Sequence, residues 1–229
     1  MNPAGLATIR EASVHFDLTV GDPGSRGRLR QVTADVNSRG LSFGYQHDVF
    51  DGGVRGHTYR LGLAGGSRGL AAGFAASMYR GDTKGTGIDL GVRYEAGGSL
   101  ILGAVLTNLR EPTVRGFRQG VTFLPGLTLR PLGPDASFSA LARLANAGPP
   151  SYAFGARVRW GKLRAPLQLL ARLDTDHALR RGAFAFGLSI GSGGGANTVG
   201  AVVATPGDVG HLDAISLYGV ATRSMTTRR

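Results

Sequence analysis

Apolar and polar residues alternate one by one along much of this chain. From Tyr152 to Trp160, Tyr, Phe, Ala, Val and Trp occupy every second position, whereas Arg157 and Arg159 lie between them. The same alternation recurs over residues 88–95, 167–174 and 184–190. A period of two is typical of a β-strand with one apolar and one polar face. The pattern therefore predicts an all-β protein.

Applied to the whole chain, this pattern predicts about fourteen strands. They lie near residues 8–19, 29–37, 41–48, 57–65, 69–79, 87–95, 99–109, 117–130, 136–146, 152–161, 166–174, 183–191, 196–205 and 213–223. Residues 99–109 and 196–205 are apolar on both faces, so the count carries an error of two strands. Most segments match the roughly 9–11 residues with which a tilted strand crosses a bilayer. The best helical candidate, residues 163–173, contains Pro166 and fits period two better.

The connections between these strands alternate in length. Longer ones, rich in charge, glycine or proline, are expected at residues 21–28, 49–56, 80–86, 110–116, 147–151, 175–182 and 206–212. Tighter turns are expected at residues 38–40, 66–68, 96–98, 131–135, 162–165 and 192–195. Bacterial outer-membrane barrels alternate in this way, with short periplasmic turns and long outer loops. An even strand number then places both termini on the periplasmic side.

Composition agrees with a membrane barrel although mean hydropathy is only −0.01. Barrel strands alternate lipid-facing apolar residues with lumen-facing polar residues, so a mean hydropathy near zero is expected. About fourteen strands would enclose more space than the side chains of a soluble barrel can fill. Aromatic residues near apolar strand ends, Tyr59, Tyr94, Tyr152 and Trp160, resemble an interfacial girdle. We therefore predict a single antiparallel transmembrane β-barrel domain over residues 1–229, located in a bacterial outer membrane.

Arginine dominates the charge of the chain. The formal net charge is +11, with 26 basic and 15 acidic residues. An arginine facing lipid at the bilayer midplane costs about 2–4 kcal/mol, so strand arginines are expected to face the lumen. The predicted pore-lining residues are Arg60, Arg93, Arg130, Arg143, Arg157, Arg159, Arg172, Asp89 and Glu95, and Asp17, Asp35 and Asp174 are further possible partners. Two interpretations stay open: an anion-attracting pore lining, or a ladder of ion pairs that fills a narrow lumen.

The N-terminal segment Asn2-Pro3-Ala4-Gly5-Leu6-Ala7, followed by an amphipathic strand, resembles the corresponding segment of the FadL-like outer-membrane proteins. That resemblance implies a fourteen-strand barrel, uptake of small hydrophobic molecules, and a position for Asn2, Pro3 and Ala4 near a plug at the periplasmic end. The chain departs from the family in its short outer loops, in lacking a long N-terminal plug, and in its Thr227-Arg228-Arg229 end. Similar compact barrels also occur fused to periplasmic protease domains of the signal-peptide-peptidase type. In that alternative, the barrel of this chain would serve as an anchor.

No enzyme, metal or cofactor site is expected. The five histidines are scattered without a paired-ligand spacing, there is no cysteine, and Gly-x-Ser-x-Gly is absent. The arginines form no aromatic-interleaved stripe, so nucleic-acid binding is not expected either. No signal peptide is visible at Met1. We expect the numbered chain to be a mature form or a fragment of a longer protein.

The leading hypothesis is a passive channel or transporter for small hydrophobic or anionic solutes, with outer-membrane lipid as its other partner. The alternatives are a barrel that anchors a periplasmic domain and a soluble arginine-rich β binding protein. The oligomeric state is left open.

Overall fold

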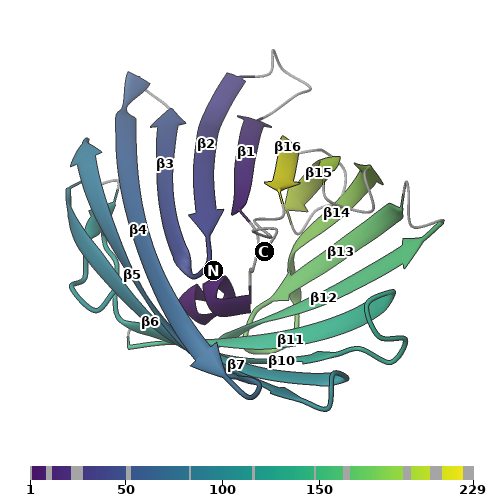
Figure 1. The fold of residues 1–229 in the computed structure, drawn as a ribbon. Helices are drawn as coiled ribbons and strands as arrows, with labels where there is room; N and C mark the ends of the chain where they lie inside the picture. The colour runs from purple at the N-terminus through teal and green to yellow at the C-terminus, as the bar shows by residue number, and fades with distance from the viewer. Residues whose placement is uncertain are drawn as a thin grey trace.

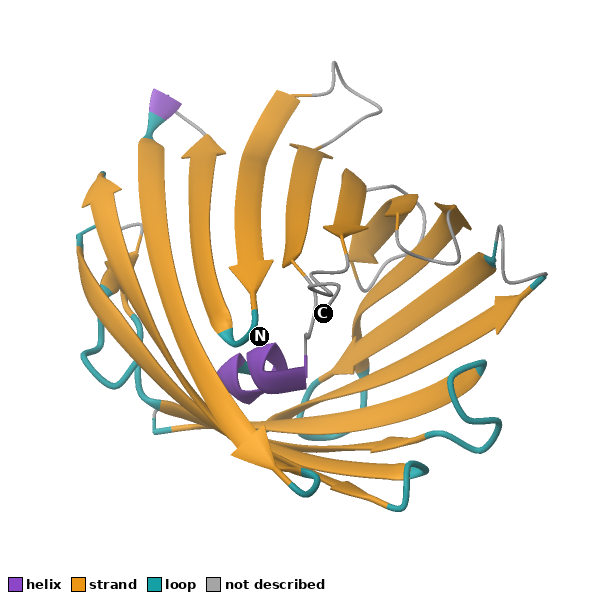
Figure 2. Cartoon of the chain, in the orientation of Figure 1, coloured by secondary structure: helices purple, strands orange, loops and turns teal. Residues whose placement is uncertain are grey.

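The chain forms one closed antiparallel barrel around a short N-terminal helix (Figure 1). This computed structural model describes residues 2–8, 12–21, 28–49, 53–82, 84–114, 117–146, 148–161, 166–192, 197–206 and 213–223. Each strand pairs with its neighbours in sequence, and β7 pairs with β10. This up-and-down order follows from the alternation of strands and connections, which leaves no long crossover in the wall (Figure 2).

The prediction of an antiparallel barrel of fourteen strands is confirmed. The wall strands are β1 (Ala12–Gly21), β2 (Arg28–Ser38), β3 (Leu41–Val49), β4 (Arg55–Ser67), β5 (Leu70–Gly81), β6 (Gly85–Ala96), β7 (Leu100–Thr107), β10 (Thr122–Leu129), β11 (Ala136–Ala145), β12 (Ser151–Trp160), β13 (Leu167–Thr175), β14 (Arg181–Ser192), β15 (Asn197–Pro206) and β16 (Ala214–Arg223). Outside the wall are a 3-10 helix, η1 (Pro3–Thr8), and a small hairpin of β8 (Thr113–Val114) and β9 (Phe117–Arg118).

Three local predictions were wrong. The first strand begins at Ala12 instead of residue 8, because Thr8 is the last residue of η1. The strand expected over 117–130 is divided: β9 pairs with β8 in a loop, and the wall strand β10 begins only at Thr122. The turn expected at 66–68 consists of Arg68 and Gly69, which lengthens β4 to Ser67.

Tight turns join the strands at the end of the barrel that carries the N-terminus of β1. Arg39 and Gly40 have φ of 44° and 87°, and Arg68 and Gly69 have φ of 51° and 82°. Two successive residues with positive φ form the type I′ turn, whose twist matches that of a two-residue β-hairpin. Arginine rarely adopts this conformation, whereas glycine adopts it without steric cost. The opposite end carries the longer loops, including the β8–β9 hairpin.

The barrel closes where its first strand meets its last. β1 and β16 pair in unbroken register from Ala12 opposite Arg223 to Gly21 opposite Ala214. This seam leaves no free edge in the wall, and a free edge would otherwise present unpaired backbone groups.

The apolar surface of the barrel faces outward. Phe43, Leu63, Val92 and Ile190 expose 54%, 51%, 51% and 57% of their surfaces, whereas polar side chains such as Thr58 and Ser189 expose 2% and 1%. A protein with this arrangement in water would lose the apolar burial that drives folding, so the outer face is suited to lipid. Among the described residues, no helix has the length and hydropathy needed to span a membrane.

Candidate functional site: the barrel lumen

The alternation within each strand assigns its polar side chains to the lumen. On β12, Phe154, Val158 and Trp160 expose 42%, 40% and 47% of their surfaces toward the outside. Arg157 and Arg159 occupy the intervening positions and therefore face inward. The same parity directs the predicted pore-lining residues of the other wall strands toward the lumen.

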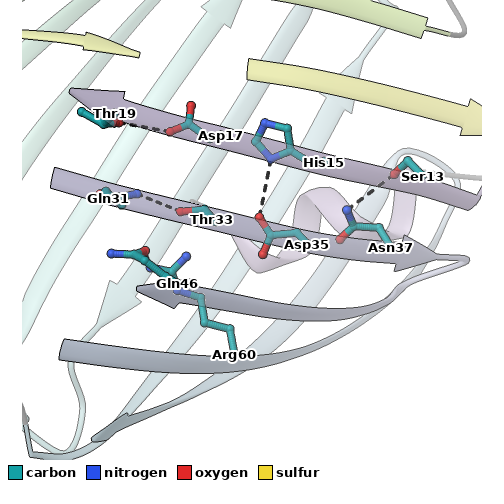
Figure 3. Close-up of polar contacts among 10 residues, drawn as sticks. All are labelled: Ser13, His15, Asp17, Thr19, Gln31, Thr33, Asp35, Asn37, Gln46 and Arg60. Atoms are coloured by element: carbon teal, nitrogen blue, oxygen red, sulfur yellow. Dashed lines mark hydrogen bonds and ion pairs between the residues drawn. The ribbon is translucent and has the colours of Figure 1, made fainter. Parts of the chain in front are cut away.

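One wall of the lumen, formed by β1–β4, is polar and cross-linked by hydrogen bonds (Figure 3). His15 Nδ1 lies 3.5 Å from Asp35 Oδ2, joining β1 to β2. Gln46 donates to both carboxylate oxygens of Asp48, at 2.8 and 3.0 Å, and its Oε1 accepts a hydrogen bond from Arg60. These contacts hold the carboxylates of Asp35 and Asp48, and Figure 3 shows His15, Asp35 and Gln46 on neighbouring strands.

The same wall continues across the seam. The Thr19 hydroxyl donates to Asp17 Oδ1 at 3.1 Å and shares a 2.7 Å hydrogen bond with the Ser216 hydroxyl on β16. The ring of His15 meets that of Tyr218 edge to face, with centroids 6.5 Å apart. The inward side chains of Asp17, Asp35 and Asp48, together with their hydrogen-bonding neighbours, are called the acidic wall below.

Four of the predicted lumen arginines form ion pairs. Arg93 Nη2 lies 2.7 Å from Glu95 Oε2, and Arg130 Nη1 lies 3.2 Å from Glu95 Oε1. Arg159 pairs at 2.7 Å with the carboxylate of Asp135, which lies in a turn. Arg172 pairs at 2.9 Å with the carboxylate of Asp174, two residues further along β13. These four arginines are therefore partnered by carboxylates, and two of the pairs, Arg93–Glu95 and Arg172–Asp174, lie within one strand.

The other predicted residues have different surroundings. Arg60 donates to Gln46 instead of a carboxylate, and Asp89 Oδ1 accepts the backbone N–H of Asn108 at 3.0 Å instead of pairing with an arginine. Within the described part of the chain, Arg143 and Arg157 have no hydrogen bond or ion pair.

Arg157 lines a cavity of about 270 Å³ in the wall formed by β11–β15. Its floor is made of small residues, including Ser139, Gly155 and Gly187, with Leu170 and Arg172 beside them. A Cβ on Gly155 would lie 2.5 Å from Ser139 Oγ, so this concavity depends on the missing side chain. The cavity thus combines an unpaired guanidinium with a small, mainly aliphatic surface.

The acidic wall lies across the lumen from the strands that carry Arg143 and Arg157. In the closed order of fourteen strands, β2 and β11 are separated by half the circumference, as are β3 and β12. The carboxylates of Asp35 and Asp48 therefore oppose the wall that carries Arg143 and Arg157. Separation of charge in this way creates a field across the lumen, and field lines are concentrated in a low-dielectric channel.

The N-terminal segment lies inside the barrel, against β4, β5 and β6 (Figures 1 and 2). The Asn2 side chain donates to Val92 O at 2.9 Å and accepts the Ala4 N–H at 2.9 Å. Ala4 is fully buried, and Leu6 is 4% exposed. Asn2, Pro3 and Ala4, selected by the resemblance, therefore form the bound part of this segment, which occupies lumen space on one side.

Glycines on three adjacent strands make room for this segment. A Cβ on Gly73 would lie 2.4 Å from the Pro3 carbonyl carbon, and one on Gly91 would lie 2.2 Å from Asn2 Oδ1. A Cβ on Gly62 would lie 2.7 Å from Leu6 Cδ1. Sequence reasoning missed this glycine seat, and its only sequence signal is glycine at inward positions of β4, β5 and β6.

Sequence reasoning also missed the uncharged members of the acidic wall. Gln46, Thr19 and Tyr218 position its charged groups, but polar residues at alternating positions carry no sign of which neighbour they will contact. Among the described residues, no group of three or more His, Asp and Glu side chains could hold a metal ion.

Comparison with known proteins finds similarity at the level of structure only. No protein-family model and no curated protein gives a significant match to this sequence. A solved structure described as a bacterial polysaccharide outer membrane secretin matches 93% of this chain and 99% of its own, with 10% identity and a TM-score of 0.60. The outer membrane protein Omp33 of Acinetobacter baumannii covers 93% and 98%, with 14% identity and a TM-score of 0.59.

A variant of Rhodopseudomonas blastica porin covers 93% of this chain and 99% of its own, with 10% identity and a TM-score of 0.51. A specific relationship to the FadL-like proteins is not among these findings. The chain shares the β-barrel fold of bacterial outer-membrane proteins.

Proposed function

We propose that this protein is a passive channel of a bacterial outer membrane that admits small organic anions. The outward apolar face supports the membrane location, because lipid is the solvent that such a face requires. The observation that carries the solute class is Arg157, an inward-facing guanidinium with no carboxylate partner among the described residues, in a cavity of small residues.

The size of the cavity favours small solutes. Sites for drug-sized ligands usually occupy about 300–1,000 Å³, and the cavity beside Arg157 has about 270 Å³. Ser137 and Ser139 offer hydroxyl groups at one side, and Leu170 and Val202 offer aliphatic surface. A carboxylate with a short apolar body matches both parts of this lining.

The opposed walls support passage instead of tight retention. A solute anion follows the side of Arg143 and Arg157, while its counter-ion is attracted to the side of Asp35 and Asp48. The bound N-terminal segment narrows the lumen beside β4–β6, so solutes pass along the remaining walls. No residue of this arrangement supplies energy, and transport follows the concentration gradient.

The experiment is ion selectivity in a planar lipid bilayer. The purified barrel, under a potassium chloride gradient, should give a reversal potential that indicates preference for chloride. One unit charge at about 4 Å in water contributes about 1 kcal/mol, which corresponds to about a fivefold change in local ion concentration. We expect Arg157→Gln to lower the chloride-to-potassium permeability ratio by up to about fivefold.

The matched control is Arg68→Gln, which removes the same charge from a turn outside the lumen. It should leave selectivity unchanged. Hexanoate added to the bath should reduce chloride current in the natural protein more than in Arg157→Gln. An Arg157→Gln channel with unaltered selectivity and unaltered hexanoate sensitivity would refute the proposed solute class.

A further inference from the structure

The outer face of β3, β4 and β5 changes toward the loop end from wholly apolar rows to a row with two tyrosines and then to a basic row. Residues in cross-strand register form successive outward rows: Leu41, Leu63 and Phe74; Phe43, Leu61 and Ala76; Tyr45, Tyr59 and Met78; and His47, His57 and Arg80. We name Tyr45, His47, His57, Tyr59 and Arg80 the rim cluster. These side chains project away from the lumen, so the channel function does not account for them.

The members of the rim cluster contact one another. The rings of His47 and His57 lie with centroids 4.7 Å apart, and those of Tyr45 and Tyr59 lie 5.3 Å apart. The Tyr45 hydroxyl lies 2.8 Å from His57 Nδ1. Arg80, directly opposite His57 on β5, is exposed. Two imidazoles and one guanidinium are thereby held in one row above two tyrosines.

This row has the chemistry of an anion site. When Tyr45 donates to His57 Nδ1, the neutral imidazole carries its proton on Nε2, which can then donate to an anion. His47 Nδ1 is buried and has no hydrogen-bond partner among the described residues. In the tautomer that leaves Nδ1 without a proton, the donor of the neutral His47 ring is again Nε2. Arg80 adds a guanidinium, the group best matched to phosphate oxygens.

The location distinguishes the ligand from a solute of the channel. The apolar rows below the cluster face lipid, tyrosines are enriched where acyl chains meet headgroups, and the basic row follows immediately on the loop side. The connections at this end are longer than the tight turns at the other end, and the longer connections mark the outer side of outer-membrane barrels. An anion here would be attached to a lipid, with its acyl chains beside Phe43, Leu61 and Leu63.

We propose that the rim cluster binds a phosphate of an outer-leaflet lipid headgroup. The inference rests on the outer-membrane location proposed above and is independent of solute selectivity. Its ligand class is a phosphorylated lipid: the phosphate lies at the row of His47, His57 and Arg80, and the acyl chains cover the apolar rows beneath it.

The test is retention of lipid A by the folded full chain in detergent micelles, measured by native mass spectrometry. Detergent-dependent solubility and a heat-modifiable gel band first establish that each variant forms the barrel. We expect the double variant His47→Ala/His57→Ala to bind lipid A about tenfold more weakly, since it loses two donors to a charged group. Arg80→Gln should weaken binding similarly and leaves both ring contacts intact.

Two controls carry matched substitutions at the same end of the barrel. His177→Ala and Arg181→Gln alter an exposed histidine and an exposed arginine outside the rim cluster and should retain lipid A fully. Lipid A without its phosphates should be lost from the natural protein. Equal retention by the cluster variants and the controls would overturn the site. Capture of inorganic phosphate without lipid A would overturn the lipid assignment, and a failure of barrel formation in the natural chain would instead refute the proposed function.

Discussion

The glycine seat of the N-terminal segment can be tested by adding one methyl group. In Gly73→Ala, the new Cβ would lie 2.4 Å from the Pro3 carbonyl carbon and 2.5 Å from the Ala4 nitrogen. Both are backbone atoms, which cannot rotate away as a side chain can. The N-terminal segment must therefore move, while the wall strand β5 keeps its own pairing.

The size of the effect follows from the contacts that hold the segment. Burial of a leucine contributes about 1.5–3 kcal/mol, and Leu6 is 4% exposed. The hydrogen bond from Asn2 to Val92 O contributes about 1 kcal/mol more. If both are lost, binding of the segment weakens by about 3 kcal/mol, or roughly a hundredfold, at about 1.4 kcal/mol for each factor of ten.

The assay uses a cysteine at position 4, because the chain contains none. Ala4, within the segment, is fully buried against the barrel wall, so the thiol of Ala4→Cys should react slowly with a maleimide in the folded barrel. Adding Gly73→Ala should accelerate labelling by about a hundredfold and should raise single-channel conductance.

Gly65→Ala is the control. A Cβ there meets nothing within 4 Å, and position 65 faces outward from β4. Labelling of Ala4→Cys should stay slow in that background. If the rates with Gly73→Ala and Gly65→Ala agree within a factor of two, the bound position of the segment does not govern access and the argument fails.

Two further predictions concern the wall and a loop. Ala156→Arg, on the outer face at the middle of β12, should lower barrel stability in lipid vesicles by about 2–4 kcal/mol, whereas the lumen-facing Ala153→Arg, whose register partner is Asp174, should be tolerated; equal urea midpoints would contradict the face assignment. In the loop after β13, backbone N–H donors of Arg180 and Ala178 lower the pKa of the exposed Asp176. Because its pKa is lowered, this carboxylate stabilises the loop at pH values above the ordinary aspartate pKa of about 3.9. The stabilisation is lost as the pH falls through the lowered pKa. Hydrogen exchange at the amides of 178 and 180 should therefore quicken, relative to a pH-matched unfolded reference, below about pH 4, and Asp176→Ala should abolish that transition.

Most wall strands were predictable because each carries its own periodic signal, whereas β7 and β15 are apolar on both faces. β12 lies within one residue of its predicted limits, since its alternation is uninterrupted and glycine or proline flanks it. The prediction for residues 117–130 was wrong because alternation continues through the loop. A Cβ on Gly120 would lie 2.2 Å from Asn146 Oδ1, a close approach between two connections that no local pattern encodes.

The lumen was predictable only in part. The cost of exposing arginine to lipid correctly indicates an inward face, but the partner of each arginine depends on register and turn geometry. Arg159 meets Asp135 across a hairpin, whereas Arg157, two residues earlier, has no partner among the described residues. The N-terminal helix was missed because six residues are too few to show a helical period, and its contacts lie about sixty to ninety residues away.

The pairing of β1 with β16 also bears on how this chain is made. Ala12 and Arg223 are neighbours in the finished wall, so the contact that completes it has nearly the greatest sequence separation the chain allows. Contacts of this kind form late, because ordering the intervening chain is entropically costly. Until the last strand arrives, both ends of the growing sheet can pair with other chains. A nascent chain of this protein therefore requires protection from association until residue 223 has emerged, and removal of β16 alone should convert a membrane protein into an aggregating one.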